Sequence, residues 1–169
     1  MLHPRYINAV LALFLAVFYA AHGVWEGLFL LGFTGYSGIA HIFGMVIFTI
    51  LIVHAVVSLL LVFVFDGRNR PVIYPRSNAA VYLQRITGII VIVLVYLHIT
   101  FYNAPFSGPM NILMVVLLGI HIGVSLPRAA VTLGLVGSDS GMKIFQAASW
   151  AASILIMIVT ILGFWGAYY

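Results

Sequence analysis

The chain has 169 residues, of which 64% are hydrophobic and only 6% are charged. A soluble domain needs far more charge on its surface, so this composition excludes one and indicates an integral membrane protein. The formal net charge of +4 comes from seven basic residues spread along the chain, a pattern that serves membrane topology and argues against nucleic-acid binding.

Five apolar runs are each long enough to cross a hydrocarbon core as a helix, which takes roughly 20 residues. In chain order we expect these helices near residues 7–31, 39–65, 79–102, 110–135 and 144–165. Their hydrophobicity is continuous rather than alternating, which excludes a transmembrane β-barrel. The connections are rich in Gly, Pro, Ser and Asn, as loops are. The sequence therefore predicts an all-α integral membrane protein, with a single transmembrane domain over residues 1–169.

All the basic residues fall on one side of this five-span arrangement. They are Arg5, Arg68, Arg70, Arg76, Arg85, Arg128 and Lys143. The opposite loops, residues 32–38 and 103–109, carry no charge. Because cytoplasmic loops carry the excess of Lys and Arg, we expect the N-terminus in the cytoplasm and the C-terminus outside.

The first four predicted helices carry one deeply placed histidine each, namely His22, His54, His98 and His121. An imidazole in a bilayer is costly unless it finds a partner, and a hydrogen bond to a neighbouring helix would satisfy any single one. Counted from the outer end of each helix, His22 lies about 14 Å deep and His98 about 6 Å deep. His121 lies about 17 Å deep and His54 about 23 Å deep. The four therefore form an outer and an inner pair, each drawn from two different helices.

Two levels of paired imidazoles in an apolar bundle are what two bis-histidine b-type haems require, because each iron takes one axial nitrogen from either side. The sequence thus predicts an outer haem on His22 and His98 and an inner haem on His54 and His121. The chain has no cysteine, so c-type haem attachment and protein-ligated iron–sulfur clusters are excluded.

The remaining sequence features refine this interpretation. Gly119 and Gly123 flank His121 and could either make room for a macrocycle or allow close helix packing. A haem arrangement with two ligands on one helix fits less well. His41 and His54 share a helix but are 13 residues apart, which turns their side chains by roughly 140° from each other.

Two segments carry a family resemblance. The segment "QRITGIIVIVLVYLH" resembles a helix of the cytochrome b subunits of succinate:quinone oxidoreductase and fumarate reductase, in which a basic and a small polar residue open the span and a haem-ligating histidine lies near its far end. The segment "HIGVSLPRAAVTLG" resembles the next helix, where a histidine is followed by Gly and a basic residue. Five helices with four such histidines look like the single-subunit, two-haem type of this anchor.

The resemblance implies a membrane anchor in a prokaryotic cytoplasmic membrane, with an iron–sulfur subunit and an FAD-containing flavoprotein docked on its cytoplasmic face. Electrons would pass between these subunits, the two haems and a menaquinone-type quinone near the outer surface. The dicarboxylate chemistry would take place on the flavoprotein. In the type that this chain resembles, the second and fourth helices hold the inner haem, and the first and third helices hold the outer one.

Three further residues are candidates for roles at these sites. Glu26 lies one turn beyond His22 on the same predicted face, so we expect it to accept a proton at a quinone site; contact with lipid headgroups is the alternative. His41 is a secondary candidate for quinone contact, against simple interfacial hydration. Arg85 is placed to contact a haem propionate.

We expect the soluble partners to dock over Arg68, Arg70, Arg76 and Lys143.

Two other classes of function remain open at the level of sequence. A transporter or channel-like bundle could use the histidines as a proton relay without any redox cofactor. A structural membrane subunit could bury them without chemistry.

Overall fold

The computed structural model describes residues 3–35, 38–65, 79–101 and 104–168. Within these ranges the chain is helical, in the order α1 (Pro4–Leu30), α2 (Gly38–Leu60), the short π-helix η1 (Leu61–Phe65), α3 (Ala79–Thr100), α4 (Ser107–Thr132) and α5 (Asp139–Tyr168). Five helices are long and apolar enough to span a membrane. The prediction of an all-α fold with five helices long and apolar enough to span a membrane is confirmed for the described residues.

The helices α1 and α5 begin earlier than hydropathy alone predicts, because polar residues cap them. The imidazole Nδ1 of His3 accepts a hydrogen bond from the Arg5 amide at 3.2 Å, and Pro4 occupies the first turn, where no amide is needed. At α5, the Ser138 hydroxyl accepts from the Gly141 amide at 3.1 Å. Apolar content marks the membrane core of a helix, whereas its end is set by these caps.

Two glycines close α1 and α4 with the same motif. Gly32 (φ 79°) and Gly134 (φ 72°) both have left-handed backbone conformations, which side chains with a Cβ atom rarely adopt. In α1 the amide of Phe33 donates to the carbonyl of Leu28, and in α4 the amide of Leu135 donates to that of Ala130, each at 2.9 Å. These bonds satisfy carbonyl groups that would otherwise be left unpaired at the helix ends.

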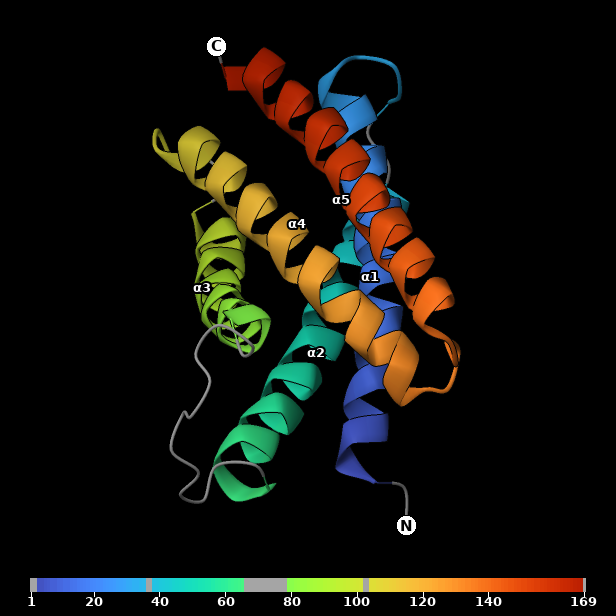
Figure 1. Cartoon of the computed structure of the whole chain (residues 1–169). Helices are drawn as coiled ribbons and strands as arrows, with labels where there is room; N and C mark the ends of the chain where they lie inside the picture. Colours follow the sequence, from blue (N-terminus) through green and yellow to red (C-terminus); the bar gives the residue numbers. More distant parts are fainter. Residues whose placement is uncertain (1–2, 36–37, 66–78, 102–103, 169) are drawn as a thin grey trace.

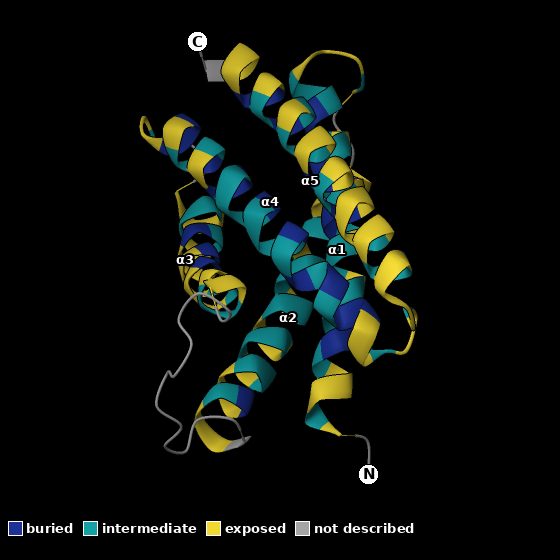
Figure 2. Cartoon of the chain, viewed as in Figure 1, coloured by how far each residue is buried: buried dark blue, intermediate teal, exposed yellow. Residues whose placement is uncertain are grey.

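The helix α4 is the centre of the bundle. It packs against α1, α3 and α5, and α5 also packs against α1 (Figure 1). Figure 2 shows that buried residues concentrate along α4, whereas the outer faces of the other helices are exposed. The helix α3 packs mainly against α4, and α2 mainly against α1. No residue of α2 whose side chain is described is buried. The bundle therefore has two hairpins, α1–α2 and α3–α4, with α5 bridging them.

The helices alternate in direction, so the two chain termini lie at opposite ends (Figure 1). The basic residues in the described ranges, Arg5, Arg85, Arg128 and Lys143, all lie towards the end where α1 begins. Arg68, Arg70 and Arg76 lie outside the described residues. The described part of the opposite loops, residues 31–35 and 104–106, carries no charged side chain.

Close backbone contact between α1 and α5 depends on glycine. A Cβ atom on Gly163 would lie 2.8 Å from the carbonyl oxygen of Gly27 and 3.0 Å from its Cα atom. Nearby, the Thr160 hydroxyl lies 3.3 Å from the carbonyl oxygen of Gly23. Since a membrane offers little hydrophobic driving force between helices, this tight packing contributes directly to association.

We therefore expect Gly163→Ala to destabilise the chain by about 1–3 kcal/mol, because the two backbones must move apart. Gly166→Ala is the matched control, since it lies on the same helix with open space around its Cα atom; it should be neutral or slightly stabilising. Unfolding of the purified protein in detergent, followed by circular dichroism, measures both. Equal stability of the two variants would contradict the role given to the Gly27–Gly163 contact.

Candidate functional site

The His121 imidazole is held between α3 and α4. Its Nδ1 atom lies 3.0 Å from the carbonyl oxygen of Gln84 and 3.1 Å from the hydroxyl of Thr87. The Thr87 hydroxyl lies only 2.6 Å from the Leu83 carbonyl, to which it donates its own proton. Both groups facing Nδ1 therefore act as acceptors. This arrangement places the ring proton on Nδ1 and leaves the lone pair on Nε2.

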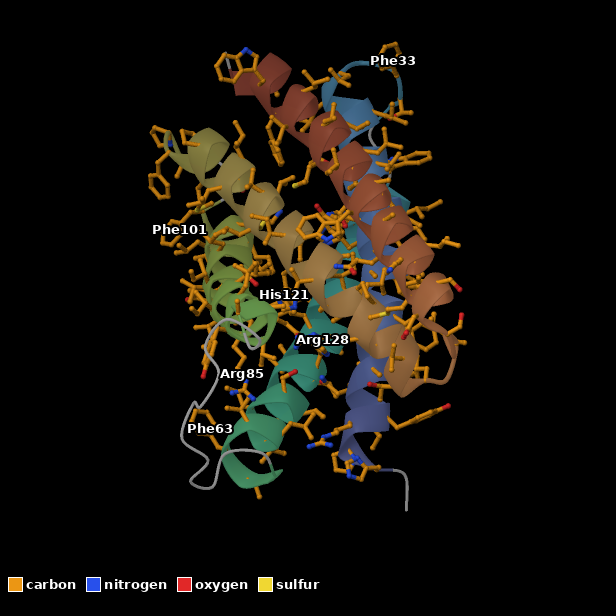
Figure 3. The ribbon with its side chains drawn as sticks, in the orientation of Figure 1. Phe33, Phe63, Arg85, Phe101, His121 and Arg128 are labelled. Atoms are coloured by element: carbon orange, nitrogen blue, oxygen red, sulfur yellow. The ribbon has the colours of Figure 1, made fainter. Side chains whose placement is uncertain are left out.

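The backbone of α3 also fits closely around this ring. A Cβ atom on Gly88 would lie 3.0 Å from Cε1 of His121, so glycine gives the imidazole its place against α3. Two turns further along α4 from His121 (Figure 3), Arg128 donates a hydrogen bond of 3.3 Å to the side-chain oxygen of Gln84. Gln84 thus contacts His121 through its backbone and Arg128 through its side chain, which ties α3 to α4 at the site.

The His54 imidazole belongs to the same region. His54 and His121 are close enough to interact electrostatically, and the backbone of Asn8 on α1 interacts with the His54 ring. The Nδ1 atom of His54 has no hydrogen-bond partner in the described structure. One turn further along α2, the Ser58 hydroxyl donates to Asn8 Oδ1 at 2.9 Å. The two residues of the predicted inner pair, on α2 and α4, are thus within range of electrostatic interaction.

The outer histidines lie against small or polar neighbours. His98 Nδ1 is 2.8 Å from Oδ1 of Asn111, a residue of α4 with no exposed surface. His22 faces α2 at Gly44, where a Cβ atom would lie 3.5 Å from His22 Cε1. Both histidines lie in the half of the bundle towards the α1–α2 and α3–α4 connections (Figure 1).

The remaining candidate residues are distributed around this core. Glu26 is half-buried in α1, one turn beyond His22, and His41 is exposed in the first turn of α2. Arg85 is exposed on α3, towards the end of the bundle where α3 begins (Figure 3). The orientation of these helices therefore puts Glu26 and His41 near one end of the bundle and Arg85 near the other.

The structure decides between the two interpretations of Gly119 and Gly123. Added Cβ atoms at these positions would collide with Met157 and Trp150, both on α5. These glycines therefore allow α4 and α5 to pack closely and do not make room beside the imidazole. The glycines that contact the histidine rings are Gly88 and Gly44, on the helices that face them.

Sequence reasoning missed several residues of the site. Gln84, Thr87 and Gly88 lie within "QRITG", a segment noted for its resemblance but not for contact with His121. Asn111, near the start of the predicted fourth helix, belongs to no motif in the sequence analysis. An uncharged polar side chain inside a predicted span usually has a hydrogen-bonding partner, and this rule was the available signal.

These features fit the ligation of a haem, which the family resemblance implies. In His121 the proton on Nδ1 is held by acceptors, the usual outer-shell arrangement of a metal-ligating histidine, and Nε2 keeps its lone pair. No group of three or more His, Cys, Asp or Glu side chains gathers in the described ranges. A haem iron, in contrast, needs only two protein ligands.

Comparison with family models, with curated proteins and with solved structures finds no match to this chain.

Proposed function

We propose that this chain is the dihaem cytochrome b anchor of a complex of the succinate dehydrogenase/fumarate reductase type. The observation that carries the proposal is the state of the His121 ring. Its proton is directed to two acceptors on α3, its lone pair is left on Nε2, and His54 on α2 is within range of electrostatic interaction with it. A proton relay would have no need to fix the ring in one tautomer.

In this proposal His54 and His121 ligate the inner haem b, and His22 and His98 ligate the outer one. When bound, the haems supply one-electron transfer along the membrane normal. The chain holds the rings in place. Gln84 and Thr87 orient His121 from α3, Asn111 orients His98 from α4, and glycines on the facing helices leave space for His121 and His22. Arg85, exposed near the start of α3, is the candidate contact for a propionate of the inner haem.

The basic end of the bundle is the proposed cytoplasmic face, by the positive-inside rule. Lys143 is exposed there in the first turns of α5, beside the exposed apolar side chains of Leu135 and Ile144. Leu135 and Ile144 line an open hollow at the α4–α5 connection. An exposed cation next to apolar surface suits a protein partner. We assign this end to the iron–sulfur subunit, with the flavoprotein beyond it.

The opposite end is the proposed site of reaction with a menaquinone-type quinone. Quinol oxidation releases protons, and a carboxylate within the bundle can accept one. Among the described residues, Glu26 is the one acidic side chain in that half of the bundle. It is half-buried one turn from His22, so it is the leading candidate for this role. His41, exposed in the first turn of α2, is the secondary candidate.

We expect a pyridine haemochrome assay on fully loaded protein to give two haem b per chain. His121→Ala and His98→Ala should each remove about one haem, because each deletes one axial ligand of a different iron. His41→Ala is the control and should retain both haems. A chain that folds without haem would refute the proposal and favour a proton relay. Loss of haem from the His41 variant would show that the ligand pairs are misassigned.

We expect a photo-cross-linker at position 143 to capture the iron–sulfur subunit in the native membrane, because Lys143 lies at the proposed docking end. The matched control is position 33, since Phe33 is 76% exposed at the opposite end (Figure 3). Mass spectrometry of the adducts identifies the partner. Capture of the same subunit from position 33 alone would mean that the proposed orientation is inverted.

We expect Glu26→Gln to keep both haems but to lower quinol-linked turnover of the assembled complex by about 100-fold or more, the usual range for loss of a general base. Artificial donors should still reduce the soluble subunits. Asp139→Asn is the control, because Asp139 lies at the other end of the bundle, in the first turn of α5. Normal quinol turnover in the Glu26 variant would remove this residue from the proposed quinone site.

A further inference from the structure

We infer that Asn111 is a positioning residue that fixes the His98 ring and, through it, tunes the reduction potential of the outer haem. This inference rests on the proposed function, because it takes His98 as an axial ligand. It assigns a role to a residue that lies outside the predicted ligand set. The juxtaposition that carries it is the 2.8 Å contact between Asn111 Oδ1 on α4 and His98 Nδ1 on α3.

The protonation state of the ring follows from this geometry. An imidazole that binds iron through Nε2 keeps its proton on Nδ1, so Nδ1 must donate a hydrogen bond. Of the two polar atoms of the Asn111 amide, only Oδ1 can accept that bond, and Oδ1 is the atom that faces Nδ1. The other atom, Nδ2, is buried with no hydrogen-bond partner in the described structure. The amide is thus oriented by the histidine contact and not by competing bonds.

The burial of Asn111 makes this contact strong and specific. The side chain has no exposed surface, so water does not compete for the hydrogen bond. A buried amide is also costly where its groups are left without hydrogen bonds. An apolar residue would fit a structural position at this depth better than asparagine. The presence of an amide here is therefore best explained by the hydrogen bond that it accepts from His98.

The two histidines of the α3–α4 hairpin are held by different kinds of acceptor. At His121 one acceptor is the backbone carbonyl of Gln84, which a substitution cannot remove. At His98 the acceptor is a side chain, so its strength is set by the amino acid at position 111. A stronger acceptor makes the imidazole a better electron donor to iron, and a better donor favours the oxidised metal. The potential of the outer haem is consequently open to tuning by the amino acid at position 111.

The test compares Asn111→Leu and Asn111→Asp in the purified, haem-loaded chain, by redox titration and by electron paramagnetic resonance. The leucine variant removes the acceptor, so the potential of one haem should rise, with haem affinity about 10–100-fold weaker. The aspartate variant keeps the volume but offers a stronger acceptor, so the potential of that same haem should fall. The resonance signal of that haem should shift, and the other haem should be unchanged.

Ser107→Ala is the matched control. Ser107 lies one turn before Asn111 on α4, is equally buried and likewise has an unpaired polar atom. If Ser107→Ala shifts the same haem as strongly as Asn111→Leu, local packing explains the effect and the inference fails. It also fails if both haems are present and neither Asn111 variant moves a potential. If Asn111→Leu does not fold, the haem potentials of the Asn111→Asp variant alone decide whether the inference holds. Absence of haem from the unmodified chain overturns the proposed function, and this inference with it.

Discussion

The ring nitrogens of an imidazole inside an apolar bundle need polar partners. The arrangement of α3 against α4 follows from that constraint. His121 and His98 lie on these two helices and point their Nδ1 atoms in opposite directions, His121 towards α3 and His98 towards α4. Each helix therefore supplies both a histidine and the acceptor for its neighbour's histidine. A shift of α3 along α4 by one turn, about 5.4 Å, would break both hydrogen bonds at once. The two polar contacts thus fix the register that apolar packing alone leaves loosely defined.

The histidine-free helix α5 gives this hairpin its support. It packs against α4 through Met157 and Trp150, which occupy the space beside Gly119 and Gly123, and against α1 at Gly27 and Gly163. The α1–α2 and α3–α4 hairpins meet mainly where α1 touches α4 and where α5 touches both. The fifth helix therefore contributes rigidity by close packing.

The extent to which the sequence predicts this structure differs between the helices and the site. Continuous hydrophobicity predicts five helices because a backbone in lipid must satisfy its hydrogen bonds internally. The helix ends were less predictable, since Pro4 and Ser138 extend α1 and α5 into polar sequence. The role of Gly119 and Gly123 could not be decided from spacing, because both alternatives require a small residue. The hydrogen bond between Asn111 and His98 depends on the geometry of the connection between α3 and α4. Hydropathy carries no information about that geometry.

In the proposed dihaem arrangement, each ligand pair takes one ring from each hairpin. The outer pair joins α1 to α3 and the inner pair joins α2 to α4, which are helix pairs that make little direct contact with each other. The rings on α3 and α4 already have their Nδ1 atoms held by protein acceptors. In contrast, Nδ1 of His54 on α2 has no such partner. The α3–α4 hairpin is therefore the preorganised half of the site, and ligation would add the α1–α2 hairpin to it. Haem binding would in this way complete the bundle, because it links two hairpins that side-chain packing joins only in part.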